Sequence, residues 1–330
     1  MTDTPLTLTD YAAEPNFLVA GVAKTLQEES PFMDKLTFVD AGSISVKTMH
    51  EGKMADVSWR RIGNPHGSVV NTKPEEKTEN VFSIGNSIVL DKMYMKDQSK
   101  RLYDPMTYQT RLTTKSIARN FCDKVINGLP SDVDNPVGLW YRVKNDLAAS
   151  QNILAKSSGL DISPDATGLA ANSQAFIDKL DELLYAVTGN FNGGQGLYFL
   201  CNSTAIMRVN SIFRQSGLTD STQDTLGRIF KEYKGAQFID MGTKYDDTTP
   251  IISDVELADG TAVTGGASTS IYAVKIGAEY FTAWQEYALD VSDPEVESDK
   301  VTWKSVIDWT VGLAISHPKA VARLYGFIAK

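Results

Sequence analysis

Residues 51–80 form a long polar stretch between two segments that alternate like β-strands. The segment before it, residues 36–50, and the segment after it, residues 81–90, both alternate apolar and polar side chains. Loops of this length are uncommon inside compact domains unless they have a function. The pattern therefore predicts an extended hairpin that projects from the body of the protein, and it limits the possible folds more than any other part of the sequence.

The predicted hairpin carries side chains suited to protein–protein contact. In the simplest interpretation, its basic and acidic residues pair with each other across the hairpin. We favour contacts with a neighbouring subunit, because a projecting loop has no core of its own to join and Trp and Arg are enriched at interface anchors. The expected intersubunit contacts of the hairpin are Trp59, Arg60, Arg61, Glu75, Glu76 and Glu79.

Residues 1–35 are predicted to form an N-terminal arm. The segment 16–22 can form a short helix, but the arm has too little periodic apolar content to fold alone. Such a segment becomes stable only when it lies on its own body or on a neighbour. We expect Phe17, Leu18 and Val19 to make its intersubunit contacts.

The clearest helix spans residues 105–127. Asp104 is a good N-cap, Pro105 suits the first helical position, and Gly128 is a typical C-terminal stop. At about 1.5 Å per residue the helix is on the order of 33 Å long. One face is apolar and carries Ile117, Ala118, Phe121, Cys122, Val125 and Ile126.

The following part of the chain, residues 150–270, has the mixed pattern of a compact α/β unit. We expect helices over 173–188, 203–216 and 225–234, and strands over 197–201, 237–240 and 250–255. Two more strands are predicted after it, over 271–276 and 300–315, and the chain ends in a short apolar segment over 320–328.

The composition argues against several classes of function. The formal net charge is -9, from 41 acidic and 32 basic residues, and no block of Lys and Arg supplies the basic face that sequence-specific nucleic-acid binding needs. No apolar run is long enough to span a membrane. The N-terminus lacks the basic and apolar regions of a signal peptide, which predicts use in a cytosol.

Motifs for catalysis or ligand binding are weak. The glycine-rich stretch 189–196 leads into a strand and lacks the lysine of a phosphate loop. The only cysteines, Cys122 and Cys201, are interpreted as small buried apolar groups. The acidic run 290–299 is interpreted as a solvated turn, with salt bridges between subunits as the alternative. We therefore expect no catalytic residue, no cofactor and no metal.

The order of these elements resembles the HK97-like fold of the major capsid proteins of tailed bacteriophages. The most specific part is the end, where Gly312-Leu313-Ala314-Ile315 leads into residues 317–324, and Val274-Lys275-Ile276-Gly277 ahead of it also fits. The resemblance implies an α+β fold made of an N-terminal arm (1–35), an extended E-loop hairpin with flanking strands (36–90), a peripheral domain (91–149) with a spine helix (105–127), an axial α/β domain (150–270), and return strands to the peripheral domain with a C-terminal segment (271–330).

The resemblance also implies a function. It implies a coat protein, not an enzyme, that self-assembles into the hexamers and pentamers of an icosahedral phage head enclosing double-stranded DNA without sequence-specific contacts. Residues 1–35 leave no room for a fused scaffolding segment, so we expect a separate scaffolding protein or a segment removed earlier, together with a portal and no membrane partner. The expected location is the capsid of the virion, assembled in the host cytoplasm.

Two other functions stay open. An encapsulin-type nanocompartment shell has the same fold and packages cargo protein instead of DNA. A soluble α/β hydrolase or transferase is the alternative from another class, and it predicts a monomer or small oligomer with a convergent polar pocket.

Overall fold

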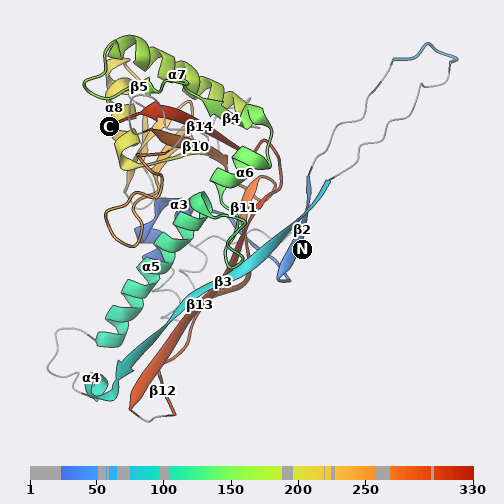
Figure 1. Ribbon diagram of the computed structural model, residues 1–330. Coiled ribbons are helices and arrows are strands. Elements are labelled where there is room, and N and C mark those ends of the chain that lie inside the picture. The colour runs from blue at the N-terminus through green and yellow to red at the C-terminus, as the bar shows by residue number, and fades with distance from the viewer. Residues whose placement is uncertain are drawn as a thin grey trace.

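The computed structural model describes residues 24–50, 57, 59–64, 75–96, 104–187, 196–218, 220–223, 227–256, 268–298 and 301–330. Within these residues the strands form two sheets, and a long helix lies between them (Figure 1). Residues 24–29 are helical, and the helices after them are α3 (Pro31–Lys35), α4 (Lys92–Lys96), α5 (Pro105–Asn127), α6 (Leu139–Asn145), α7 (Leu169–Ala186) and α8 (Ser203–Gln215), with a 3-10 turn η2 (Ala149–Gln151).

The first sheet is six-stranded and mostly antiparallel. Its order is β1 (Phe38–Asp40), β11 (Phe281–Val291), β13 (Thr302–Ile315), β3 (Glu75–Asp91) and β2 (Ser45–His50), with β12 (Glu295–Val296) beside β13. On β13 the side chains of Ile307, Trp309 and Val311 are buried, whereas those of Val306 and Asp308 are exposed. This alternation gives the sheet one core face and one solvent face.

The second sheet is eight-stranded, mixed and buried on both faces. Its order is β4 (Asn152–Leu154), β14 (Val321–Ile328), β10 (Thr269–Lys275), β6 (Leu197–Cys201), β9 (Ala236–Asp240), β8 (Ile229–Tyr233) and β7 (Ser221–Gln223), with β5 (Leu160–Asp161) beside β14. On β10, Ile271 and Ala273 face a core shared with α7 and α8, while Tyr272 and Val274 face a core shared with α5. Burial on both sides explains why these strands are continuous apolar runs.

Helix α5 begins and ends at the predicted residues. The Asp104 carboxylate accepts hydrogen bonds from the backbone N–H groups of Met106 and Thr107, each at 3.3 Å. The apolar face of the helix packs on the first sheet, where the rings of Phe121 and Trp309 lie 5.1 Å apart. Trp309 also contacts Phe38 of β1, at 5.6 Å between ring centroids, so one aromatic cluster joins the N-terminal strand, the helix and β13.

Two secondary-structure predictions are wrong. Residues 225–234 were expected to be helical, but residues 229–233 form β8, which pairs with β9 through a two-residue turn. Lys234 and Gly235 of that turn both have positive φ, 50° and 84°, which is the backbone of a type I′ hairpin turn. The expected strand 250–255 is a loop instead, because Ile251 and Ile252 bury their side chains in the core beside α5 rather than joining a ladder.

The structure also places two predicted segments differently from the expected domain boundaries. Strands β10 and β14 belong to the eight-stranded sheet, so β11, β12 and β13 are the strands of the described return region that lie in the first sheet. The last part of the expected arm, residues 24–35, packs into the protein's own core, where Leu26, Phe32 and Met33 are buried. The residues of the expected arm before position 24 lie outside the described residues. Cys122 and Cys201 are buried free thiols, as predicted.

The Asp104 cap provides a test of how α5 is stabilised. Replacing Asp104 by Ala removes the acceptor for two N–H groups and is expected to lower the free energy of unfolding by about 1 kcal/mol. Urea denaturation followed by circular dichroism measures the change. Asp104→Ser is the matched control, because Ser also caps well, and an equal loss in both variants would contradict the capping role.

Candidate assembly interface

The feature that positions the candidate interface is the length of β3. Its residues 81–91 pair with β13 inside the first sheet, and residues 75–80 pair with β2 alone. At about 3.3 Å per residue the whole strand spans roughly 56 Å. Figure 1 shows the β2–β3 ribbon leaving the body of the molecule in the direction away from α4 and β12. The predicted hairpin is therefore an extension of a core strand.

The described residues beyond the ribbon are strongly exposed. Val57, Trp59 and Ile62 are 85%, 103% and 103% exposed. Arg60 and Arg61 are exposed as well, and the Arg60 guanidinium donates to the backbone oxygen of Asn64 at 3.1 Å. Clustered exposed apolar residues mark interaction surfaces. We call residues 57 and 59–62 the tip surface.

The three predicted glutamates differ in their surroundings. The Glu75 side chain lies outside the described part of the structure. Glu76 pairs with Lys47 across the hairpin at 3.4 Å, with both side chains more than half exposed. Pairing across the hairpin thus occurs at Glu76, with a lysine of β2 as its partner. An intersubunit role for the six hairpin residues stays a prediction.

Glu79 is held inside its own chain by Arg142 of α6. The side chains are 14% and 7% exposed, and both guanidinium Nη atoms contact the carboxylate, one of them at 2.8 Å. Arg142 also donates to the backbone oxygens of Val137 and Leu313, at 2.8 Å and 3.2 Å. This bidentate pair ties the base of the hairpin to α6 and β13, and bidentate geometry fixes orientation as well as distance.

The arm residues Phe17, Leu18 and Val19 lie outside the described residues, so their predicted contacts stay untested. The chain that follows them is attached to α5. Glu29 pairs with Lys115 at 2.9 Å and with Arg119 at 2.7 Å. Burial raises the pKa of Glu29, but the hydrogen bonds and charges of Lys115 and Arg119 outweigh it and hold the pKa below its ordinary value.

The opposite end of β3 carries a second exposed surface. Lys92 donates its N–H to the Val301 oxygen at 2.7 Å, which places α4 beside the start of β13, and β12 pairs with β13 there. The exposed residues described at this end are mainly apolar or acidic: Met93, Tyr94, Asp293, Glu295, Val296, Ser298 and Val301. We call them the far-end surface. A partly exposed lysine, Lys304, pairs there with Glu297 at 3.5 Å. Most of the acidic run predicted to be a solvated turn lies here, between β11 and β13, and Asp299 lies outside the described residues.

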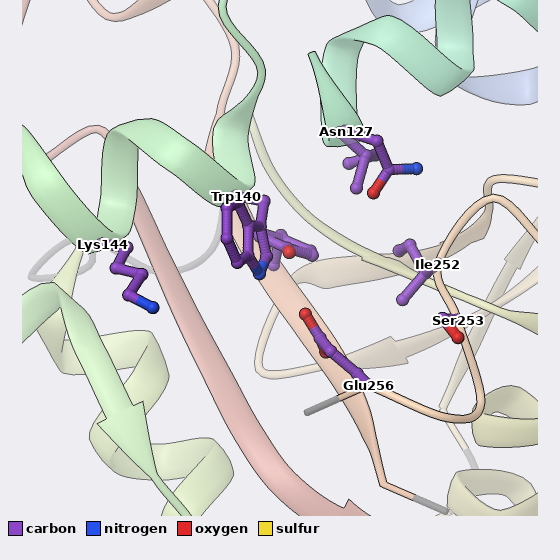
Figure 2. A pocket seen from close by; sticks show the side chains of 8 residues that line it. Asn127, Trp140, Lys144, Ile252, Ser253 and Glu256 are labelled. Carbon is purple, nitrogen blue, oxygen red and sulfur yellow. The ribbon is translucent and has the colours of Figure 1, made fainter. Parts of the chain in front are cut away.

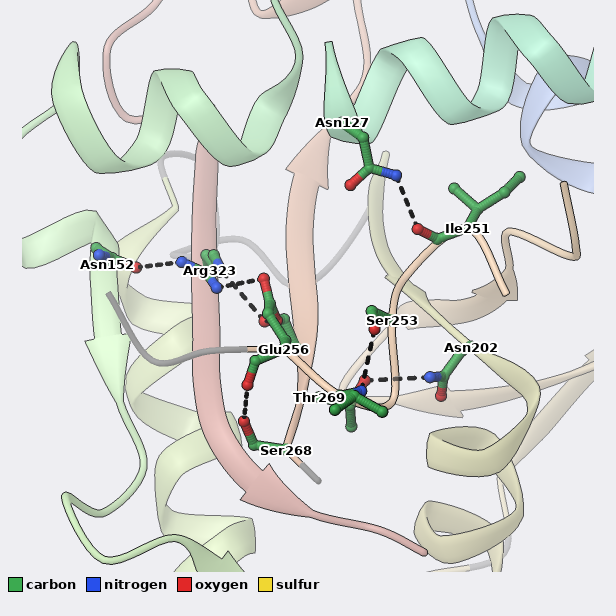
Figure 3. Close-up of polar contacts among 11 residues, drawn as sticks. Asn127, Asn152, Asn202, Ile251, Ser253, Glu256, Ser268, Thr269 and Arg323 are labelled. Atoms are coloured by element: carbon green, nitrogen blue, oxygen red, sulfur yellow. Dashed lines mark hydrogen bonds and ion pairs between the residues drawn. The ribbon is translucent and has the colours of Figure 1, made fainter. Parts of the chain in front are cut away.

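A cavity of about 400 Å³ lies where α5, α6 and β10 meet, and Figure 2 shows its polar side chains. Two of these side chains already have structural partners. Asn127 donates to the Ile251 oxygen at 2.8 Å, and the Glu256 carboxylate pairs with the buried guanidinium of Arg323 (Figure 3). The cavity is therefore lined by groups that hold the 250–256 loop in place.

The described residues also limit other kinds of site. Among them, no group of three or more His, Cys, Asp or Glu side chains is placed to hold a metal ion. No helix among them is both long and apolar enough to cross a membrane. The glycine-rich stretch 189–196 lies outside the described residues except for Gly196.

Comparisons with known proteins give no match in sequence but several in structure. No protein-family model and no curated protein matches the chain. A subunit of the holo-SrpI encapsulin complex from Synechococcus elongatus is 15% identical with a TM-score of 0.58, over 100% of this chain and 93% of that one. The capsid of a native GTA particle is also 15% identical with a TM-score of 0.58, over 88% of both chains. The capsid of Myoviridae phage XM1 is 14% identical with a TM-score of 0.52, over 89% of this chain and 90% of that one.

The Arg142–Glu79 pair gives a prediction about stability. Glu79→Ala leaves a buried guanidinium without its carboxylate and is expected to lower the free energy of unfolding by about 3 kcal/mol. Glu76→Ala, on the same strand, removes an exposed pair and is expected to cost less than about 1 kcal/mol. Chemical denaturation of both variants measures the difference, and equal losses would show that burial of the pair has no energetic role.

Proposed function

Because the chain has the HK97-like fold, we propose that it is a major capsid protein, assembling into the hexamers and pentamers of an icosahedral phage head. In this role it is a structural subunit and catalyses no reaction. Its location is the virion, after assembly in the host cytoplasm. The likeness to capsid subunits over most of the chain supports this, and so does a hairpin whose exposed apolar residues have no core within the described chain.

One observation carries the proposal: the two ends of β3 have complementary surfaces. The tip surface combines Trp59 and Ile62 with the basic residues Arg60 and Arg61, whereas the far-end surface combines apolar and acidic side chains. Figure 1 shows the β2–β3 ribbon at one end of the first sheet and α4 with β12 at the other, so the two surfaces are not expected to meet within one chain. A contact between the tip of one copy and the far end of the next is heterologous, and heterologous contacts close into rings or continue as arrays.

The energetics suit assembly from many modest contacts. Full burial of an exposed large apolar side chain is worth about 1.5–3 kcal/mol, and ion pairs at a rim add specificity more than affinity. Each contact between two copies is weak, but a closed ring contains many such contacts, and together they stabilise the ring. A rigid hairpin base, fixed by Arg142 and Glu79, lowers the entropic cost of each contact.

The content of the shell is double-stranded DNA in this proposal. The chain has a net charge of -9, so DNA is held by enclosure and not by a strongly basic wall. A separate scaffolding protein and a portal act as partners during assembly. The second candidate is an encapsulin-type shell around cargo protein, which the match to an encapsulin subunit along the whole chain favours. Nucleic acid or cargo enzyme in particles purified from the natural source distinguishes the two.

The tip surface predicts the outcome of a double substitution. The variant Trp59→Ser with Ile62→Ser is expected to fold normally, because both side chains are fully exposed, and to form no closed shells. Negative-stain microscopy and sedimentation velocity measure assembly, and circular dichroism measures folding. Val133→Ser is the control, since Val133 is also exposed, at 80%, but lies on neither surface. Shells of normal stability from the double variant would remove the main support for the proposal.

Charge complementarity predicts a rescue. Arg60→Glu with Arg61→Glu is expected to reduce assembly at least tenfold, because like charges then face each other across the contact. Asp293→Arg with Glu295→Arg in the same chain is expected to restore shells, most clearly at low salt where screening is weakest. If the fourfold variant assembles no better than the first, the tip does not meet the far-end surface.

A further inference from the structure

One edge of β3 lacks a partner strand in the described structure. β13 covers one edge of residues 81–91, but β2 covers the opposite edge only over residues 75–80. The Val81 N–H donates to the Ile44 oxygen at 2.9 Å, so Val81 points to the β2 side. In an antiparallel strand alternate residues direct both backbone groups to the same edge. The outward residues that follow are therefore Ser83, Gly85, Ser87 and Val89, and all four are exposed.

The composition of this edge is unusual for one that stays open. Residues 82–90 contain no charged residue and no proline. Folded proteins protect long edge strands with lysines, prolines or bulges, or they cover them. Within the described residues only one outward N–H, that of Ser87, is occupied, by the Asn86 side chain at 2.9 Å. The edge is thus built to be covered by another segment.

A groove of about 310 Å³ lies beside the edge. Phe82, Ile84 and Gly85 form its β3 side, and Phe121 and Asn135 line the facing side. The Asn135 side-chain oxygen is buried and has no donor among the described residues. A strand added to β3 would place alternate side chains in this groove and present donors near Asn135, which is how sheet edges recognise extended segments.

The sequence contains a segment that fits such an edge. Residues 5–11 read Pro-Leu-Thr-Leu-Thr-Asp-Tyr, in which Leu6 and Leu8 alternate with Thr7 and Thr9. Period-two alternation with β-branched residues is the pattern of a strand with one apolar face. Two leucines on that face match a groove floored by Phe82 and Ile84, and the threonines then face away from the groove.

The position of the arm favours a donor from another copy. The described chain that follows residues 1–23 is fixed at Lys115 of α5 through Glu29, whereas the groove is lined by Lys124 of the same helix. These two lysines are nine positions apart, which is about 180° around an α-helix. Glu29 also pairs with Arg119, which is about 140° around the helix from Lys124, so Glu29 lies on the side of α5 away from the groove.

We propose that residues 5–11 of a second copy add as a strand to the outer edge of β3 between residues 82 and 90, with Leu6 and Leu8 in the groove. This inference rests on the proposed shell function, because it needs a second copy nearby. It gives the shell a contact based on backbone hydrogen bonds, separate from the contact between tip and far end.

Hydrogen exchange of the full-length chain tests the proposal. The amides of Ser83, Gly85 and Val89 are expected to exchange at least about tenfold more slowly in assembled shells than in the unassembled chain. In shells of the variant Leu6→Ser with Leu8→Ser this protection is expected to disappear, and Thr7→Ser with Thr9→Ser is the control that keeps it. Unchanged protection in the leucine variant overturns the proposal, and so does equal protection before assembly, which would place the chain's own arm on the edge.

A crosslinking measurement covers the case in which the leucine variant does not assemble. Benzoylphenylalanine at position 8, in shells mixed with isotope-labelled chains, is expected to crosslink residues 82–90 or 120–136 of a differently labelled copy. Crosslinks only elsewhere, or only within one chain, overturn the strand contact. If the wild-type chain forms no shells at all, the proposed shell function is wrong. If shells form but the amides of Ser83, Gly85 and Val89 exchange as fast as in the unassembled chain, only the strand contact is wrong.

Discussion

The backbone hydrogen bonds of strand β3 connect the first sheet to the projecting hairpin, and the rest of the structure depends on them. The pairing of β3 changes along its length: residues 81–91 pair with β13 inside the first sheet, and residues 75–80 pair with β2 in the ribbon that leaves it. Because β3 runs without a break from the first sheet into the ribbon, the direction of the strand in the sheet sets the direction in which the hairpin projects. The rigidity that a projecting element needs therefore comes from the sheet.

Two further contacts connect this strand to the rest of the chain. The aromatic cluster around Trp309 fixes α5 on the core face of the first sheet, and the Arg142–Glu79 pair fixes the hairpin base to α6. Beyond α5, the eight-stranded sheet buries both faces, one against this shared core and one against α7 and α8. The result is a body of two sheets joined through α5, from which the β2–β3 ribbon projects with its base held by the Arg142–Glu79 pair.

Such a body fits assembly better than catalysis. Two polar groups that line the cavity between α5, α6 and β10 hold a loop in place, and exposed apolar and charged side chains lie together on the tip surface and on the far-end surface. In the proposed assembly, the tip surface of one copy contacts the far-end surface of the next, and the outer edge of β3 accepts a strand from another copy. Both kinds of contact are weak for an isolated pair and become strong through repetition in a closed shell.

The sequence by itself determined the local elements. The bounds of α5 follow from Asp104, Pro105 and Gly128, and the alternation along β13 and the long polar stretch after β2 predicted the core strand and the hairpin, because these signals lie within a few residues of the structure they specify. Tertiary structure decided what depends on distant partners. An apolar run such as 229–233 fits a helix or a strand until β9 pairs with it. The ion pair of Glu79 joins residues 63 positions apart in the sequence, and the assignment of β10 and β14 to the second sheet depends on which ladders they enter. Within the described residues, the outer edge of β3 from 82 to 90 has no partner strand because β2 begins only at Ser45, opposite Asn80, and the length of β2 is set by pairing in space, which no local pattern encodes.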